Sequence, residues 1–228
     1  MREADAKTLL FAGPTLSRAQ KIDPDLSLAG ITLLPPVTRG DLFAMDVHPT
    51  GVCVLVDGLF HQSLAVGHAE VRRLLRAGWQ VWGLSSMGAI RAREMCHLGV
   101  RGFGRVFERF CQTGVDFRDD EVALLHDSAP SYRELSEPLC HLRRAVEVLV
   151  MEGRLAPMHG ARIIEDLAER WFGDRTLARF LELLNAYSGD GKIDPAAILS
   201  RFDEFRLKAW DLLDFLRSRP DLKQRLAG

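Results

Sequence analysis

The chain has 228 residues, 47% of them hydrophobic, and its 30 lysine and arginine residues nearly balance 31 aspartate and glutamate residues. This balance gives no electrostatic support for nucleic-acid binding, and no uncharged apolar stretch is long enough to span a membrane. The first residues are charged with both signs, unlike a secretion signal, so we expect a cytoplasmic protein. The four cysteines lack CxxC spacing, which predicts reduced thiols and no metal site; they are Cys53, Cys96, Cys111 and Cys140.

The first half of the chain alternates short apolar runs with helical patterns. The runs span residues 8–12, 31–34, 52–56 and 80–84. Helices are predicted after Ser17, after Thr38 and over about residues 66–77. Such alternation is typical of a parallel sheet with helices on both faces, and it places ligands at the carboxyl ends of the strands.

From about residue 104 the pattern is helical only. Ser136 is predicted to cap a helix with an apolar stripe, and a second stripe spans residues 161–171. A third stripe, over residues 198–216, predicts one long helix after Asp194. We therefore predict an α/β core domain over residues 1–130 and a helical region over residues 131–228. Residues 188–194 resemble a calcium-binding loop but lack its first and last carboxylates, which predicts a simple turn between helices.

Ser85 and Ser86 stand where the apolar run at 80–84 turns into a helix. The free N–H groups and the positive dipole end of a helix favour an anion or an oxyanion at this point. Ser86 could act as a nucleophile if a base lies nearby. The alternative is that either serine only caps the helix, because the stretch is not a Gly-x-Ser-x-Gly motif.

Two histidines and two aspartates could complete a catalytic arrangement. His68 or His126 could take the proton of Ser86, and Asp57 or Asp120 could orient that histidine. The candidate binding residues around them are Gly13, Pro14, Thr15, Ser85, Gly88, Arg91, Asp119 and Glu121.

The acidic run at residues 119–121 has several interpretations. Its carboxylates could simply favour a helix start, hold Mg²⁺ with a substrate phosphate, bind a basic partner, or orient His126 or Arg91. A phosphate or nucleotide site at Gly13–Thr15 is a further hypothesis, weakened because the stretch lacks a Walker lysine.

With these clusters in view, the chain resembles the TfuA-like family over about its first 130 residues. The matching residues are Gly13-Pro14-Thr15-Leu16, Pro35-Pro36, Gly40-Asp41, Asp57-Gly58, Phe60, Val66, His68, Glu70, Ser85-Ser86-Met87-Gly88-Ala89, Arg91, Ala92, Glu94, Gly99, Gly102, Gly104, Asp119-Asp120-Glu121-Val122-Ala123 and His126. The helical second half adds little to this resemblance.

The resemblance implies a partner of YcaO enzymes, which activate backbone amides with ATP and form thioamides in ribosomal peptide natural products or in a modified protein. It further implies that the TfuA-like partner releases sulfide from the thiocarboxylated C-terminus of a ThiS-like carrier, with the precursor peptide as a possible third partner and with no cofactor. Ser86 would then attack the acyl carbon, His68 or His126 would take its proton, and the N–H groups after Ser86 would stabilise the oxyanion.

In this scheme Asp57 would orient the base or bind the carrier tail. No cysteine lies in the matching motifs, which argues against a persulfide relay. The alternative function is a non-enzymatic adaptor that binds YcaO and its peptide through the helical region.

Overall fold

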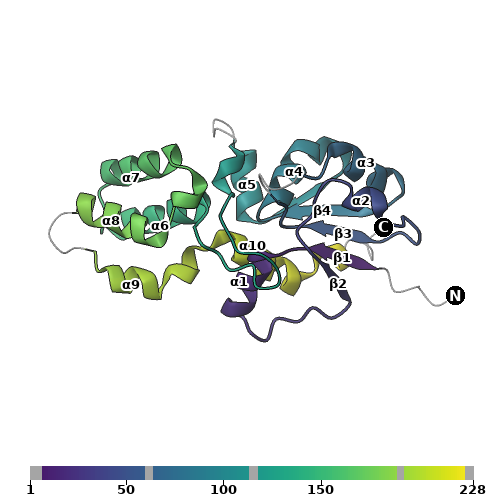
Figure 1. Cartoon of the computed structure of the whole chain (residues 1–228), viewed down its shortest axis with the longest axis horizontal. Helices are drawn as coiled ribbons and strands as arrows, with labels where there is room; N and C mark the ends of the chain where they lie inside the picture. Colours follow the sequence, from purple (N-terminus) through teal and green to yellow (C-terminus); the bar gives the residue numbers. More distant parts are fainter. Residues whose placement is uncertain (1–6, 60–63, 113–117, 189–192, 224–228) are drawn as a thin grey trace. The chain divides into compact units, whose positions relative to one another are not determined.

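The computed structural model describes residues 7–59, 64–112, 118–188 and 193–223 (Figure 1). Its internal contacts divide the chain into two compact units. We call them the sheet unit, Met1–Phe117 with Lys208–Gly228, and the helical unit, Arg118–Leu207. Among the described residues, no helix has the length and apolar character needed to cross a membrane.

The sheet unit contains a five-stranded parallel sheet in the described residues, which confirms the predicted α/β class. Its strands are β1 (Thr8–Phe11), β2 (Ile31–Leu34), β3 (Val52–Leu55), β4 (Gln80–Leu84) and β5 (Arg101–Phe103), in the order β2-β1-β3-β4-β5. The four strands expected from the sequence are present, β1 and β3 each ending one residue early. β5 was not predicted, because three residues of the sequence Arg-Gly-Phe contain no apolar run.

Helices cover both faces of this sheet (Figure 1). One face packs against α2 (Asp41–Ala44), α3 (His68–Arg76) and α4 (Met87–Met95). The other face packs against α1 (Pro14–Ile22) and α10 (Leu207–Ser218), while α5 (Arg105–Cys111) follows β5 and α11 (Pro220–Lys223) follows α10. α1 begins at Pro14, before the predicted start after Ser17.

Strand β3 shows how one apolar run serves two cores. Cys53 and Leu55 belong to the core beneath α3 and α4, whereas Val52 and Val54 belong to the core beneath α1 and α10. Alternate side chains of a strand point to opposite faces, so a continuous apolar run is what a central parallel strand requires. Cys53 is completely buried in the core beneath α3 and α4.

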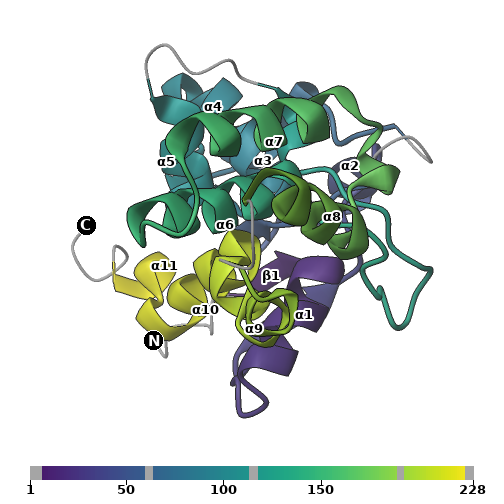
Figure 2. The same ribbon diagram turned by 90° about the vertical axis from the view of Figure 1, so that its left-hand side faces the viewer.

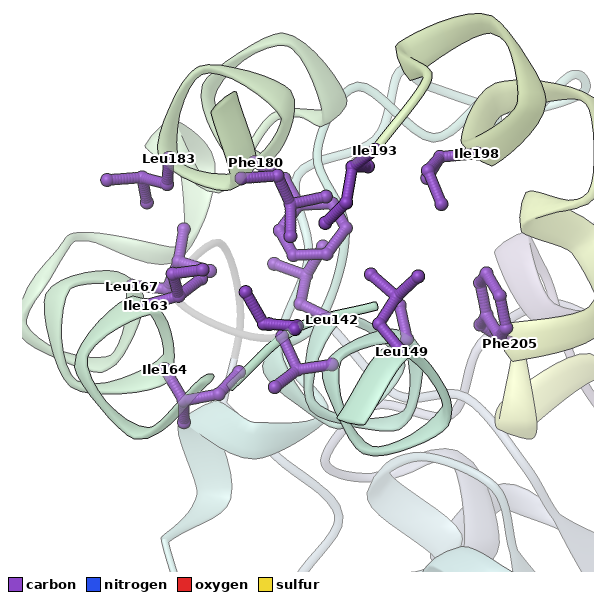
Figure 3. Packing of buried hydrophobic residues seen from close by; sticks show 14 of the residues in the cluster. Leu142, Leu149, Ile163, Ile164, Leu167, Phe180, Leu183, Ile193, Ile198 and Phe205 are labelled. Carbon is purple, nitrogen blue, oxygen red and sulfur yellow. The ribbon is translucent and has the colours of Figure 1, made fainter. Parts of the chain in front are cut away.

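The helical unit packs around one apolar core (Figure 3), and Figure 2 shows the ribbon of its helices. Its helices are α6 (Leu139–Met151), α7 (Pro157–Glu169), α8 (Leu177–Ser188) and α9 (Pro195–Ser200), with short 3₁₀ turns at Asp119–Glu121, Phe172–Asp174 and Phe202–Phe205. Leu142 and Leu149 of α6 face Ile163 of α7 and Phe180 of α8 in this core (Figure 3). Of the stripe predicted over residues 161–171, Ile164 and Leu167 point into this core, whereas Ala161 and Trp171 at its two ends are exposed.

Two details of the helical prediction are wrong. The long helix expected over residues 198–216 is broken: α9 ends at Ser200, a 3₁₀ turn follows, and α10 begins at Leu207. Phe202 and Phe205, three residues apart, both pack into the helical unit through that turn. Ser136 does not cap α6, since the cap is Pro138 and the Ser136 hydroxyl accepts the Leu125 N–H at 2.8 Å.

The units differ in extent from the predicted domains, whose boundary at residue 130 stays a prediction. Residues 118–130 group with the helices, and residues 208–228 return to the sheet. The central residues of the predicted turn at 188–194, namely 189–192, lie outside the described residues, as does Phe60. Asp194 does cap α9, its carboxylate accepting the Ala196 N–H at 2.9 Å.

Candidate functional site

The carboxyl ends of β1, β3 and β4 lie side by side at one edge of the sheet, as the prediction requires. Gly13, Asp57 and Ser85 follow these three strands in turn. The strand order reverses between β1 and β3, and doubly wound sheets bind their ligands at such a switch point. Gly13 and Asp57 therefore occupy the place where a ligand is most expected.

The Asp57 carboxylate is bonded within the protein at this switch point. One oxygen accepts the backbone N–H groups of Gly13 at 2.9 Å and Thr15 at 3.0 Å, and the other accepts the Thr15 hydroxyl at 2.7 Å. Asp57 is buried. It therefore satisfies the N-terminus of α1 as a capping carboxylate does, although it comes from another strand.

These bonds limit what the first turn of α1 can bind. The N–H groups of Gly13 and Thr15 already donate to Asp57, and Pro14 has none to offer. Among the described residues, Asp57 accepts no hydrogen bond from a histidine. Substrate binding by Gly13, Pro14 and Thr15 stays a prediction, and an anion there would have to displace the Asp57 carboxylate.

Ser85 adopts a backbone conformation that is uncommon for a residue with a side chain. Its φ is +64°, in the left-handed region, and its side chain is completely buried. The Ser85 hydroxyl donates to the backbone carbonyl of Lys208 at 2.8 Å, so this serine does not cap α4. Conformational strain of this kind is concentrated at functional sites, which makes the turn the leading candidate in the sheet unit.

Ser86 is the N-cap residue of α4, yet its side chain makes no capping hydrogen bond. This observation removes the simple capping explanation for Ser86. Ser86 is nearly as buried as Ser85. Two N–H groups of the following turn are already engaged, since Gly88 donates to the Val56 carbonyl at 3.1 Å and Ala89 donates to the Ser86 carbonyl. Among the described residues, no backbone hydrogen bond outside the regular helices and strands uses the Met87 N–H, which leaves this donor available to another acceptor.

Glycine at position 88 allows α4 to start directly against the sheet. A Cβ atom on Gly88 would lie 1.7 Å from the Leu55 carbonyl oxygen, and one on Gly83 would lie 2.1 Å from the Gly88 oxygen. Neither space accepts a methyl group. Gly88 thus fixes the position of the turn, and its predicted part in substrate binding stays a prediction.

His68 lies at the start of α3, where it joins an ion-pair cluster with α4. Its Nε2 atom lies 2.8 Å from a Glu94 carboxylate oxygen, and the same oxygen binds the Arg91 guanidinium. Arg91 also donates to the Val66 carbonyl at 2.9 Å. Because a carboxylate only accepts, Nε2 of His68 carries the proton and Nδ1 of the neutral ring keeps its lone pair.

The cluster bonds His68 to Glu94, which lies in the last turn of α4. Ser86 and Glu94 are eight residues apart, about 12 Å along a helix axis. Within the described residues, no hydrogen bond joins Ser86 to His68. The structure therefore brings His68, Arg91 and Glu94 together but does not bond this cluster to Ser86.

His126 belongs to the helical unit, where its own loop fixes its tautomer. Nδ1 lies 2.7 Å from the Asp127 carbonyl oxygen and must donate to it, so Nε2 of the neutral ring carries the lone pair. The ring also contacts Tyr132, with centroids 5.8 Å apart. The Asp127 carboxylate accepts the Ser131 hydroxyl and the Arg133 N–H, and the Ser131 bond in particular lowers the pKa of Asp127.

Two carboxylates of the acidic run bind arginines of the helical unit. Asp120 accepts a hydrogen bond of 2.6 Å from Arg175, and Glu121 forms an ion pair with Arg143. Arg175 is buried and also donates to backbone carbonyls, including those of Asp120 and Leu167 at 2.8 Å each. Asp119 is exposed.

These pairs show how the acidic run is anchored within its unit. Binding of Mg²⁺ by Asp120 or Glu121 would require breaking them. Within the described residues there is no group of three histidine, cysteine, aspartate or glutamate side chains suited to a metal ion.

Three residues with clear structural roles were not singled out as site residues. Glu94 was noted only in the family resemblance, Arg175 lay in an unmarked stretch, and Lys208 contributes only a backbone carbonyl to Ser85. The spacing of Arg91 and Glu94 was a usable signal for a helical ion pair. No sequence pattern reports the other two contacts, because each joins distant parts of the chain.

The sheet and its turns define a doubly wound α/β protein with a strained serine turn at the carboxyl end of a central strand. A family model described as TfuA-like protein matches residues 57–176, more than half of the chain. The chain belongs to the TfuA-like family. No curated protein matches the sequence.

The matched range differs from the resemblance drawn from the sequence. It begins at Asp57, so it includes the Ser85–Ser86 turn and the acidic run but leaves out Gly13–Thr15. It also extends through α6 and α7, which shows that part of the helical unit is a family feature. Membership supports an accessory, partner-associated role in the TfuA/YcaO system.

Proposed function

We propose that this protein releases sulfide from the thiocarboxylated C-terminus of a ThiS-like carrier and supplies it to a YcaO enzyme that forms backbone thioamides. Precursor peptide is a further partner in this proposal. The observation that carries it is the turn in which left-handed Ser85 precedes Ser86, the N-cap of α4, whose hydroxyl makes no capping hydrogen bond. Family membership supports the accessory role, and the turn supports the reaction type.

The reaction needs a nucleophile, a base and an oxyanion site. The Ser86 oxygen attacks the carbonyl carbon of the thiocarboxylate, the C–S bond breaks, and sulfide leaves. Water then cleaves the acyl-serine ester, so the carrier ends as a carboxylate and the net change is addition of one water and loss of hydrogen sulfide. The Met87 N–H is the donor that supports oxyanion stabilisation beside Ser86.

The buried position of Ser86 favours a narrow substrate. An extended C-terminal tail can reach such a hydroxyl, whereas a folded protein surface cannot. His68 and His126 are the two proposed bases, because each has one ring nitrogen bonded to an acceptor and the other free to take a proton. Asp57, Asp120, Arg91, Asp119 and Glu121 are proposed as supporting residues.

The test is sulfide release from a thiocarboxylated ThiS-like carrier by the full-length protein, alone and with a YcaO protein. Ser86→Ala is expected to reduce release by about 100-fold or more, as loss of a nucleophile does. Ser200→Ala is the matched control, because Ser200 is exposed and bonds only within its own helix. An unchanged rate in Ser86→Ala would overturn the assignment.

The same assay separates the two histidines. We expect one of His68→Gln and His126→Gln to lose release by about 100-fold, and the other to remain near the wild-type rate. His97→Gln serves as the control, since His97 is an exposed histidine at the end of α4. Full activity in both variants would exclude His68 and His126 as the base.

The second candidate function is a non-enzymatic adaptor for YcaO and its peptide. Large apolar side chains are exposed in the helical unit, among them Trp171 at 57% and Met158 at 62%. If they bind the partner, Trp171→Ala should weaken the complex about tenfold while Ser86→Ala leaves it intact. Ser200→Ala, at an exposed polar position, is the control on the same unit. Absence of sulfide release together with this pattern would favour the adaptor.

A further inference from the structure

The chain makes a tight three-residue turn between β4 and α4, with Ser85 at its centre. The Ser86 N–H donates to the Leu84 carbonyl at 2.7 Å, which closes the turn across Ser85. Three-residue turns with a positive φ at the central residue are rare and strained, and the φ of Ser85 is +64°. Such a conformation persists only where the surrounding structure holds it in place.

One restraint on this turn comes from α10, far along the chain. The Ser85 hydroxyl donates to the backbone carbonyl of Lys208, the second residue of α10, at 2.8 Å. Ser85 is completely buried, so water does not compete for this hydrogen bond. The bond therefore fixes the Ser85 side chain and opposes rotation of the turn that carries it.

The other restraint comes from the packing of the first turn of α4. The Gly88 N–H donates to the Val56 carbonyl at 3.1 Å, and a Cβ atom on Gly83 would lie 2.1 Å from the Gly88 oxygen. This close packing leaves the helix start little room to shift against β3 and β4. The backbone of Ser86 is thus held on one side by the packed glycines and on the other by the Ser85 turn.

We infer that Ser85 is a positioning residue that holds the Ser86 hydroxyl ready for attack, and that Lys208 of α10 supplies the acceptor this role requires. Ser85 acts here through Ser86 and not by contact with the substrate. The inference rests on the proposed function, since it names how the nucleophile of that reaction is held. It also extends the site beyond residues 57–176, the range that the family model matches, because Lys208 lies outside this range.

The first test is steady-state sulfide release from a thiocarboxylated ThiS-like carrier by the full-length protein. Ser85→Ala removes the hydroxyl, and we expect kcat to fall about 10- to 100-fold while KM changes less than about threefold, because a displaced nucleophile slows the reaction more than it weakens binding. Ser218→Ala is the matched control, since the Ser218 hydroxyl also donates to a carbonyl of α10, that of Phe215 at 3.4 Å. We expect this control to keep the wild-type kcat.

A glycine variant separates the hydrogen bond from the backbone conformation. Ser85→Gly also lacks the hydroxyl, but glycine adopts a positive φ without strain, so this variant should fold even if Ser85→Ala does not. We expect the same loss of kcat in both variants. A wild-type kcat in Ser85→Gly would show that the hydrogen bond to Lys208 is not needed, and it would overturn the inference.

A double mutant distinguishes positioning from general destabilisation. The residual sulfide release of Ser86→Ala should not fall further when Ser85→Ala is added, because no nucleophile then remains to be positioned. A second loss as large as that of Ser85→Ala alone would show that Ser85 acts independently of Ser86. That result would also overturn the inference.

Hydrogen exchange distinguishes failure of this inference from failure of the proposed function. In Ser85→Ala and Ser85→Gly the N–H groups of Ser86 and Gly88 should exchange about tenfold faster than in the wild type, whereas Ser218→Ala should leave them unchanged. If the wild type releases no sulfide, the proposed function fails, while faster exchange still supports Ser85 as the restraint on Ser86. If Ser86→Ala abolishes release but the Ser85 variants match the wild type in kcat and exchange, this inference alone fails.

Discussion

Asp57 accepts three hydrogen bonds from the turn after β1, although it follows β3, so one carboxylate joins two strand ends at the switch point. The placement of Asp57 beside Gly13 could be predicted from the sheet topology, but the direction of its carboxylate could not. A side chain has several rotamers, and the choice depends on which N–H groups lack partners. Sequence reasoning therefore found the right residues and left their bonds undetermined.

Removal of the Asp57 carboxylate should destabilise the sheet unit. Asp57→Ala leaves the N–H groups of Gly13 and Thr15 unpaired, and we expect the free energy of unfolding to fall by about 3 kcal/mol. Thr15→Val removes only the hydroxyl bond and should cost about 1 kcal/mol. Urea unfolding of both variants and of their double mutant measures these terms. Strictly additive losses would show that the two residues do not interact.

Gly88 offers a sharper test of packing at the same edge. Gly88→Ala would place a methyl carbon 1.7 Å from the Leu55 carbonyl oxygen, so strands or helix must shift. We expect a loss of about 3 kcal/mol, the upper part of the range for overpacking. Gly67→Ala is the control, since its Cβ would meet only the Glu70 carboxylate at 3.4 Å. Equal stability of both variants would contradict the close approach.

At the scale of elements, the strands were predicted well and the helix connections poorly. β4 lies where its apolar run predicted, because a buried parallel strand needs such a run, and β2, a partly exposed edge strand, also matches its run. β5 has only three residues and no apolar signal, so its pairing with β4 decides its structure. The break between α9 and α10 could not be predicted, because the apolar stripe of the sequence continues across it. The residues before the break pack into the core of the helical unit, and those after it pack against the sheet.

The start of α5 resembles the start of α1, because in both a carboxylate from another element accepts the backbone N–H groups of the first turn. Asp211 of α10 accepts the N–H groups of Arg105 and Val106 at 2.9 Å each. A Cβ on Gly104 would lie 2.4 Å from the Asp211 carboxyl carbon, and Gly104 has a φ of +90°. Both facts give a physical reason for glycine at this position.

Asp211 should make the stability of the protein depend on pH. Burial raises the pKa of Asp211 to about 6, and hydrogen bonds from Val106 and Arg105 offset only part of that rise. The native state then holds a proton that the unfolded chain, with a pKa of about 3.9, has released. The free energy of unfolding therefore falls as pH rises from about 4 to 6, by at most about 3 kcal/mol for this group.

Asp211→Asn isolates this contribution. The variant cannot titrate at this position. The free energy of unfolding of the wild type should therefore fall relative to that of the variant as pH rises from about 4 to 6. Urea unfolding at several pH values from 4 to 7 measures the difference in free energy of unfolding between the two proteins. The contributions of the other titrating groups are common to both and cancel in this difference. A difference that is constant with pH would show that Asp211 has an ordinary pKa in the folded protein.

At the scale of the whole chain, the α/β class and the helical second half could be predicted, but the return of the C-terminal residues to the sheet could not. The apolar stripe of α10 predicts a helix with one buried face and carries no information on which core receives it. In the structure Leu212, Leu213 and Phe215 pack against β1, β3 and β4. Deletion of everything after residue 130 would therefore also strip one face of the sheet.

The packing of α10 gives a direct prediction. Phe215 is buried and contacts the Trp82 and Phe103 rings, with centroids 5.5 and 5.3 Å away. Phe215→Ala should lower the free energy of unfolding by about 3–5 kcal/mol, as expected for a buried aromatic residue. Leu199→Ala, at an exposed position, should change it by less than about 0.5 kcal/mol. Similar losses in both variants would contradict the assignment of α10 to the sheet core.

The late position of α10 in the chain has a consequence for synthesis on the ribosome. The last strand ends at Phe103, but α10, which covers one face of the sheet, begins at Leu207, about a hundred residues later. At 5–20 residues per second, the ribosome needs roughly 5–20 s to make the intervening segment. During that interval the part of this face that α10 covers stays open to water beside α1, and a chaperone that shields it would have its greatest effect before α10 emerges.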